Sequence, residues 1–291
     1  MSADGLRSEA EQAVDPRVID PLAGVRARGR IDLSVQNRNG TTRRERVREE
    51  GAFRIRFPRE RLNRLDGILV NVAGGVTGGD HYQVEVMAGA GTRTALSTVA
   101  AEKIYRSAAD IARIDVSLRL DEDAQLFWLP QETIIFDRAR LARRIDVEMA
   151  ATARLTFCEA TYLGRTAMGE SVREIDWREA WTLRRGGRRI FAERLRLHGD
   201  ATQALSSKAT GADLRAMATL IHVAPDAEDL CEPLRERLAG HSIDRCEAAV
   251  SSFDGMLIVR MIARHGHDLR PCLVDCLSVF PGADLPRAWQ T

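Results

Sequence analysis

Four glycines lie within six residues of one short segment, Asn71-Val72-Ala73-Gly74-Gly75-Val76-Thr77-Gly78-Gly79-Asp80. A glycine-rich turn after a strand is typical of phosphate-binding loops, in which a lysine contacts the phosphates. Here Asp80 stands at the position of that lysine, and its carboxylate would repel a triphosphate. The dinucleotide spacing Gly-x-Gly-x-x-Gly is missing as well. The alternative interpretation is a tight turn whose backbone is bound by Asp80.

Other acidic residues share the placement of Asp80 at expected strand ends or turns, namely Glu102, Glu132, Asp137 and Glu170. Two such carboxylates on a β scaffold can cleave a glycosidic bond, one as acid and one as base or nucleophile. Carboxylates can equally bind a hard divalent cation. Spacing alone does not choose between these chemistries, and each residue is also explained as a solvated turn residue.

Closely spaced softer candidate ligands lie near the end of the chain. His265 and His267 precede Asp268 at the start of an expected helix, where they are either ligands or exposed residues beside a helix cap. Cys272 and Cys276 share one face of that helix because they are four residues apart. The same face carries leucines, which favours packing over metal binding.

The elements that must position these residues are mostly strands. Short runs of alternating or apolar residues recur, with glycine-rich or acidic turns between them, at 67–73, 82–87, 93–99, 113–120, 125–129, 145–149, 154–162, 180–183 and 188–197. Gly186-Gly187 between two arginine pairs predicts a hairpin. Many strands without helix-length segments between them predict a mostly antiparallel or coiled all-β body.

The last third of the chain has a different pattern. Residues 213–222 and 227–238 are predicted helices, the second with Asp226 as its N-cap. Residues 256–263 are a predicted strand and residues 268–280 a final helix. We therefore expect a flexible leader over residues 1–24 and a single domain over residues 25–291. That domain has a β body to about residue 200 and a helix-containing part from about residue 201.

Composition excludes several classes of protein. Lys+Arg 43 against Asp+Glu 42 gives a net charge of +1, so no global field attracts nucleic acid or an anionic membrane. No apolar run approaches the roughly 18 residues of a membrane span, and the leader does not resemble a secretory signal. Five cysteines, without a Cys-x-x-Cys pair, argue against a disulfide framework. These features predict a cytoplasmic protein.

Four segments together resemble the urease accessory protein UreD (UreH) family in order and spacing. They are residues 71–80, Glu102-Lys103-Ile104-Tyr105-Arg106-Ser107, Leu129-Pro130-Gln131-Glu132-Thr133-Ile134 and Gly164-Arg165-Thr166-Ala167-Met168-Gly169-Glu170. The resemblance is strongest over residues 65–175, and Pro286-Arg287-Ala288-Trp289 is similar to the end of that family's chains. Each segment alone is weak, but four in register are specific.

The resemblance implies a mainly β fold with a coiled, β-helix-like arrangement of many short strands and a few helices in the C-terminal third. It also implies a chaperone rather than an enzyme, a urease maturation factor that works with UreF and the GTPase UreG. Such a protein is a scaffold that relays nickel(II) to apo-urease, with the ion in transit and no tightly bound cofactor.

A nickel relay gives the scattered acids a physical interpretation. Nickel(II) accepts carboxylate, imidazole and water ligands, and a conduit must hold it loosely at several places. Asp80, Glu102, Glu132 and Glu170 lie in the resembling segments, whereas Asp137, His265 and His267 have no clear counterpart in the family pattern. Two alternatives remain open: a carbohydrate-active β-helical enzyme that uses paired carboxylates, and a β-rich interaction module without ion chemistry.

The glycine-rich segment leads to a first prediction. Because an aspartate replaces the phosphate-binding lysine, we expect the purified chain to hydrolyse neither GTP nor ATP and to bind neither saturably. Equilibrium dialysis with each labelled nucleotide, in the absence of any GTPase, measures this. Saturable binding would contradict the prediction.

Overall fold

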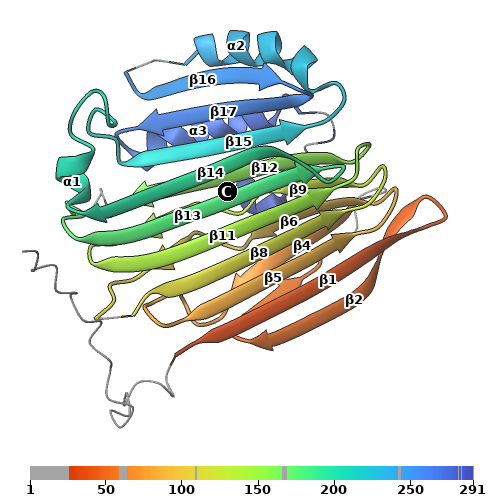
Figure 1. The fold of residues 1–291 in the computed structure, drawn as a ribbon, viewed down its shortest axis with the longest axis horizontal. Helices are drawn as coiled ribbons and strands as arrows, with labels where there is room; N and C mark the ends of the chain where they lie inside the picture. Colours follow the sequence, from red (N-terminus) through yellow and green to blue (C-terminus); the bar gives the residue numbers. More distant parts are fainter. Residues whose placement is uncertain are drawn as a thin grey trace, which may run out of the picture.

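The computed structural model describes residues 26–58, 64–108, 110–165, 169–241, 244–280, 282 and 284–290. The expected leader and residues 166–168 of the fourth family-like segment lie outside the described residues. The strands form two sheets, one in front of the other (Figure 1). The front sheet has seven strands in the order β14 (Arg188–Gly199), β13 (Ile175–Arg185), β11 (Ala139–Met149), β8 (Ala112–Leu120), β5 (His81–Ala88), β1 (Arg28–Arg38) and β2 (Thr41–Gly51).

The rear sheet has ten strands. Its main path is β16 (Cys246–Phe253), β17 (Met256–Ala263), β15 (Ala216–Val223), β12 (Arg154–Leu163), β9 (Gln125–Trp128), β6 (Arg93–Thr98), β4 (Leu65–Asn71) and β3 (Phe53–Arg56). Two short strands leave this path, of which β10 (Thr133–Ile135) pairs with β12 and with β7 (Glu102–Ile104). The remaining elements are α1 (Ala201–Ala204), η2 (Ala227–Leu230), α2 (Cys231–Ala239), α3 (Gly266–Leu277) and η3 (Arg287–Trp289).

The chain coils between the two sheets, and this confirms the β-helix-like prediction. From β4 to β13 it alternates between rear and front, so that β4, β6, β9 and β12 are parallel neighbours behind and β5, β8, β11 and β13 are parallel neighbours in front. The antiparallel alternative holds only at the margins of the sheets, in pairs such as β1–β2, β13–β14 and β12–β15.

The coil is stabilised by inward side chains that repeat from strand to strand. Alternation places Val116, Leu118 and Leu120 of β8 between the sheets. Parallel register then stacks each of them on an equivalent apolar residue of β5 and β11, such as Val84 and Ile145 on either side of Val116. Each coil therefore adds one row to a continuous core.

Two turn predictions are confirmed. Gly186 and Gly187 join β13 and β14 as a tight hairpin in which Arg185 pairs with Arg188, and both glycines have positive φ, at 56° and 76°. At the glycine-rich segment the backbone N–H of Thr77 donates to Asp80 Oδ2 at 2.8 Å. The N–H of Ala27 donates to Oδ1 at 2.8 Å, so Asp80 also fixes the start of the described chain to this turn.

The predicted helix at residues 213–222 is wrong, because this segment contains strand β15. Its residues are apolar on both sides, and such a run matches helical and strand spacing equally well. The reason for a strand is tertiary: β15 lies between β12 and β17 in the rear sheet. Ile221 faces the core between the sheets, and Leu220 faces a second core under the helices.

The helix at residues 227–238 is confirmed only in part. A 3₁₀ turn, η2, comes first, and the α-helix α2 begins at Cys231. Asp226 does not cap it, since no side-chain capping bond forms there. Instead Arg154 Nη1 donates to Asp226 Oδ1 at 2.6 Å. A long-range ion pair has replaced the local cap.

The final predicted helix is confirmed as α3, which begins at Gly266. Leu269, Cys272, Leu273 and Cys276 are buried along one face, so the cysteines pack as expected. In Figure 1, α3 lies behind the sheet at β15 and β17, while α2 lies beside β16. No helix in the described part of the chain is long and apolar enough to cross a membrane.

The C-terminal segment returns to the rear sheet and is bound there by polar contacts. Trp289 Nε1 donates to the carbonyl oxygen of Leu129 at 2.9 Å. The buried Arg64 pairs with Asp66 at 2.7 Å and also donates to the carbonyl oxygens of Gly282 and Asp284. The family-like end of the chain is thus part of the fold.

His222 on β15 is a buried imidazole. Its Nδ1 lies 2.9 Å from Thr156 Oγ1, its ring centroid lies 4.7 Å from that of Phe280, and its Nε2 has no hydrogen-bond partner among the described residues. Burial disfavours the charged ring and lowers the pKa of His222 to about 4.

This lowered pKa predicts acid sensitivity. Below the ordinary pKa of 6.5 the unfolded chain protonates His222 while the folded chain does not, so stability falls as pH falls, by about 2 kcal/mol at pH 5. His222→Gln should remove this part of the pH dependence, whereas His198→Gln, at an exposed position of β14, should retain it. Urea unfolding of the three proteins at pH 7 and pH 5 measures the difference. Identical pH dependence in wild type and His222→Gln would contradict the prediction.

Candidate functional site

The coil brings the family-like segments together as adjacent rungs of one wall. Strand β7 of the second segment pairs with β10 of the third, with Glu102 opposite Thr133. Strand β10 pairs in turn with the end of β12, directly before the fourth segment, and Val76 of the first forms a bridge with Ile104. Segments that lie apart in the sequence therefore form one continuous surface because each occupies the same position in successive coils.

A cavity of about 300 Å³ opens beside this wall and extends between the two sheets. Its polar lining comes from several coils and includes Asn71, Glu102, Gln131, Thr133, Arg143 and Glu159. The remaining lining is largely apolar, from residues such as Val84 and Trp128. A concave, mostly apolar space with a few convergent polar groups is the usual form of a binding site.

Of the five acids selected from the sequence, Glu102 is the one that lines this cavity. Asn71 Nδ2 donates to the Glu102 carboxylate oxygens at 3.2 and 3.3 Å. The backbone N–H of Glu102 donates to the carbonyl oxygen of Glu132. Burial raises the pKa of Glu102 to about 7, and the hydrogen bond from Asn71 only partly offsets it. Glu102 is thus a half-buried carboxyl group that is not held by an ion pair in the described structure.

Glu132 lies next to the cavity, beside the lining residue Gln131. Arg270 of α3 donates to Gln131 Oε1 at 2.9 Å and to Glu132 Oε2 at 3.3 Å, and its guanidinium lies 5.1 Å from the Trp289 ring. The Nε2 of Gln131 has no partner in the described part of the chain, although the residue is only 6% exposed. The C-terminal segment therefore positions this part of the cavity wall.

The floor of the cavity is an ion cluster that the sequence analysis missed. Arg143 of β11 donates from Nε to both carboxylate oxygens of Glu179, at 2.9 and 3.0 Å, and from Nη1 to Glu159 at 2.6 Å and Thr133 at 3.1 Å. Arg143, Glu159 and Glu179 are at most 7% exposed. The cluster joins the front sheet, through β11 and β13, to β12 of the rear sheet.

Three tryptophans complete the cluster. Trp128 Nε1 donates to Glu159 at 2.9 Å, and Trp177 and Trp181 donate to the two oxygens of Glu179 at 2.6 and 2.8 Å. Burial would lower the pKa of Arg143, but the two carboxylates raise it, so the guanidinium is charged. The sequence did contain a pattern that could have revealed this cluster. Arg143, Glu159 and Glu179 stand at inward strand positions, where the neighbouring inward residues are mostly apolar.

The other selected acids bind loop backbone rather than the cavity. Asp80 accepts the two backbone hydrogen bonds described above and is buried. Asp137 Oδ1 accepts from the N–H groups of Arg173 and Glu174 at 2.7 and 3.0 Å. Glu170 accepts from the N–H of Asp137 and from both the N–H and Nε of Arg165, and these bonds outweigh burial to lower its pKa.

The two histidines lie at the start of α3, outside the cavity lining. Their rings stack with centroids 5.2 Å apart, and His267 Nε2 lies 3.6 Å from Asp268. Within the described ranges, no group of three or more His, Cys, Asp or Glu side chains is arranged to hold a metal ion. Carboxylates that meet a cation here would therefore do so one at a time.

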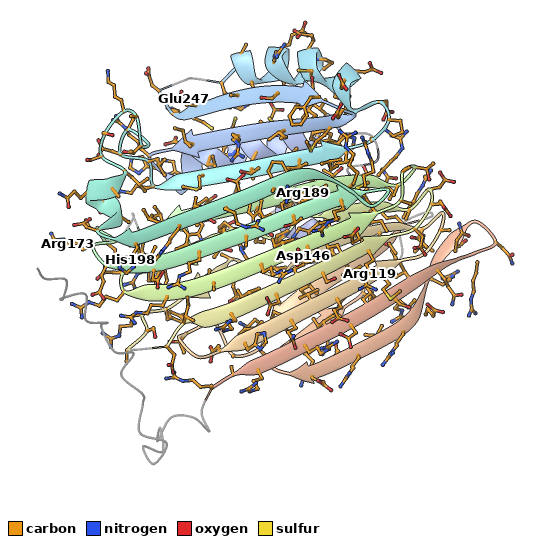
Figure 2. All side chains as sticks on the ribbon, in the orientation of Figure 1. Arg119, Asp146, Arg173, Arg189, His198 and Glu247 are labelled. Carbon is orange, nitrogen blue, oxygen red and sulfur yellow. The ribbon has the colours of Figure 1, made fainter. Side chains whose placement is uncertain are left out.

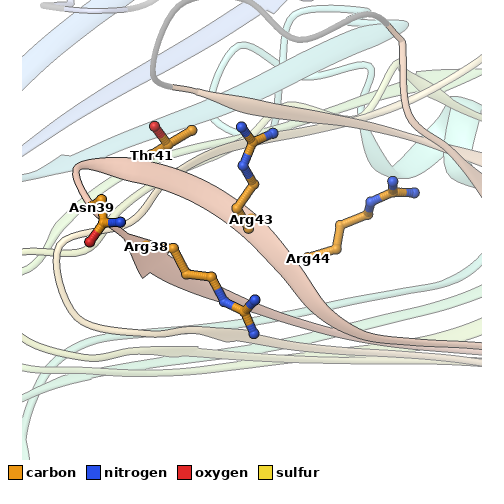
Figure 3. Close-up of a pocket in the computed structure, with 5 residues that line it drawn as sticks. All are labelled: Arg38, Asn39, Thr41, Arg43 and Arg44. Atoms are coloured by element: carbon orange, nitrogen blue, oxygen red, sulfur yellow. The ribbon is translucent and has the colours of Figure 1, made fainter.

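A larger open hollow of about 570 Å³ lies at the tip of the β1–β2 hairpin, between Arg38, Asn39, Thr41, Arg43 and Arg44 (Figure 3). It contains no residue of the family-like segments and no carboxylate among those five residues. We therefore base the functional argument on the cavity between the sheets.

The buried cluster predicts a large loss of stability on substitution of its cation. Arg143→Met would leave Glu159 and Glu179 facing each other without a counter-charge, at a cost of about 3 to 5 kcal/mol. Arg144→Met, on the exposed side of the same strand, should cost less than about 1 kcal/mol. Urea unfolding monitored by tryptophan fluorescence compares the two. Similar losses for both variants would contradict the prediction.

Comparison with known proteins agrees with the resemblance found in the four segments. The family model for the UreD urease accessory protein matches residues 27–290. Urease accessory protein UreD 3 of Bradyrhizobium sp. strain BTAi1 is 44% identical over 264 residues, 91% of this chain and 94% of the relative. Urease accessory protein UreD of Methylobacterium sp. strain 4-46 is 44% identical over 269 residues, 91% of this chain and 95% of the relative. Urease accessory protein UreD of Rhodopseudomonas palustris strain BisB5 is 38% identical over 289 residues, 99% of each chain. The chain therefore belongs to the UreD family of urease accessory proteins.

Proposed function

We propose that this chain supports urease maturation as a scaffold and nickel relay that acts with UreF and UreG on apo-urease in the cytoplasm. Family membership supports the role in maturation. The observation that carries the relay is the position of Glu102, a carboxyl group without an ion-pair partner among the described residues, in a cavity beside the family-like wall. Nickel(II) is the cargo in this proposal and no cofactor stays bound.

The chemistry of the cavity suits a transient cation. Glu102 offers carboxylate oxygens, Thr133 a hydroxyl group, and the space of about 300 Å³ leaves room for water ligands of the ion. One carboxylate with water binds nickel weakly, as a relay requires, since a complete ligand cage would trap the ion. The floor offers no free carboxylate, because Arg143 and Trp128 bind Glu159, so we expect the ion to stay near Glu102.

The remaining acids have different parts in this proposal. Glu132 lies beside the cavity, where Arg270 neutralises part of its charge. Asp80, Asp137 and Glu170 shape the loops of the wall through backbone hydrogen bonds. Contact of Asp80, Asp137 or Glu170 with the ion would compete with these backbone hydrogen bonds. His265 and His267 lie at the start of α3, outside the cavity lining.

The carbohydrate-active alternative has less support. It needs two carboxyl groups that can exchange protons or attack a sugar. The cavity lining contains two, but Glu159 is bound by Arg143 and Trp128. For Glu159 to act on a sugar it would have to leave Arg143 and Trp128, and this would break the cluster that joins the sheets.

The relay predicts that nickel delivery and complex formation respond separately to substitution. Glu102→Gln retains the shape of the side chain but loses its charge, so we expect less nickel in urease, by about threefold or more, with an unchanged yield of the complex with UreF. Glu85→Gln, on the exposed face of β5, is the matched control and should change neither quantity. Nickel content of purified urease and recovered complex are measured from the same cells.

A substitution of Asp80 provides the contrasting case. Asp80→Ala leaves the N–H groups of Ala27 and Thr77 without their acceptor, at a cost of about 1 to 3 kcal/mol. Soluble protein, complex and nickel should then fall together. If Glu102→Gln also lowers all three in proportion, Glu102 is structural and the relay proposal fails at this residue. If Glu102→Gln leaves nickel content unchanged, the cavity is not the path.

A further inference from the structure

The outward face of the seven-stranded sheet carries a row of aligned side chains. Strand register places Arg46 of β2, Ser34 of β1, Met87 of β5 and Arg119 of β8 opposite one another in turn. The same row continues through Glu148, Arg184 and Arg189 on β11, β13 and β14. Figure 2 shows Arg119 and Arg189 on the face of this sheet that is turned to the viewer.

The acids of this face already have partners. Every outward acid of the five parallel strands forms an ion pair with an arginine or a histidine of the same face; these acids are Asp32, Glu85, Asp115, Asp146, Glu148 and Asp176. In contrast Arg46, Arg119 and Arg189 are exposed and have no ion pair within the described residues. The row contains four arginines and Glu148, and Glu45, the neighbour of Arg46 on β2, accepts a hydrogen bond from Ser34 of the row, so the net charge with Glu45 included is +2.

The spacing of the three unpaired arginines is regular. Arg119 lies three strands from Arg46 and three strands from Arg189. At about 4.8 Å per strand, each interval is about 14 Å and the row is about 29 Å long. Asp32, Glu85 and Asp146 lie two residues away on one side, and the turn at Asp121-Glu122-Asp123 follows β8 on the other. Asp32, Glu85 and Asp146 are ion-paired with Arg30 and Arg144, so the positive charge forms a narrow line between a neutral strip and the acidic turn.

Met87 adds an apolar contact in the middle of the row. Its side chain is 54% exposed although it lies between two polar neighbours, Ser34 and Arg119. Methionine and arginine are both enriched where proteins bind other proteins, and lysine is depleted there. The narrow width of the line disfavours a broad anionic partner such as a duplex and favours a linear one.

We propose that this row is the docking site for an acidic segment of a partner protein that lies across the strands of the seven-stranded sheet. An extended segment of about nine residues spans the row. Its carboxylates pair with Arg46, Arg119 and Arg189, and an apolar side chain of the segment covers Met87. The site is on the outward face, separate from the cavity, so it can be tested without reference to nickel.

A peptide of ten glutamates with a fluorescein label is the probe, and anisotropy at low ionic strength measures its binding to the full chain. We expect saturable binding that weakens with added salt. Reversal of all three charges, Arg46→Glu with Arg119→Glu and Arg189→Glu, should lower the affinity at least about tenfold. Met87→Gln should leave binding of this purely acidic probe within about twofold, because it removes no charge.

The matched control carries the same change in net charge at exposed positions elsewhere, as Lys208→Glu with Arg245→Glu and Arg264→Glu. It should bind the probe within about twofold of wild type. An equal loss in both triple variants would mean that only net charge matters and would overturn the proposal. Absence of saturable binding to wild type would overturn it too. Tighter binding of a ten-nucleotide thymidine strand, lost in the same triple variant, would assign the row to phosphates instead. Thermal unfolding of each variant verifies that it is folded.

Discussion

The charged cluster around Arg143 connects the two sheets of this protein, and much of the remaining structure depends on it. Its guanidinium binds Glu179 within the front sheet and Glu159 across the core, while three indole N–H groups satisfy the carboxylates. A buried charge without such partners is strongly destabilising, so each member constrains the position of the others. The register of β11 against β13, and the separation of both from β12, follow from one set of contacts.

The same cluster explains why a cavity exists at this point in a β-helix. Apolar rows such as Val86, Leu118 and Val147 fill the space between the sheets elsewhere. Beside Arg143 the inward residues are polar, and the short strands β7 and β10 lead away from the main path of the rear sheet. Space therefore remains between the family-like wall and the charged floor, and Glu102 is the acid of that wall that lines it.

The two faces of the front sheet have different physical properties because strand side chains alternate. The inward face carries the core and the cluster, and the outward face carries ion pairs with an excess of arginine. A protein with a net charge of only +1 can thus present a local line of positive charge. Strand register aligns those charges: five parallel strands carry the middle of the row, and the antiparallel edge strands β2 and β14 add Arg46 and Arg189.

The sequence by itself determined the class of fold, most strands from residue 65 to residue 199, the hairpin at Gly186-Gly187 and the family. Each of these depends on short-range patterns such as alternation and glycine turns. For Asp80 the sequence left a turn role and a metal role open, and only the tertiary structure showed that both of its carboxylate oxygens accept backbone hydrogen bonds. Only the tertiary structure decided that residues 216–223 form a strand, because a segment buried on both faces has no periodicity that distinguishes strand from helix. Only the tertiary structure showed that Asp226 binds Arg154 instead of capping a helix. It also decided which acid lines the cavity and that Arg143 meets Glu159 and Glu179, because contacts between coils depend on register, which no single segment of sequence encodes.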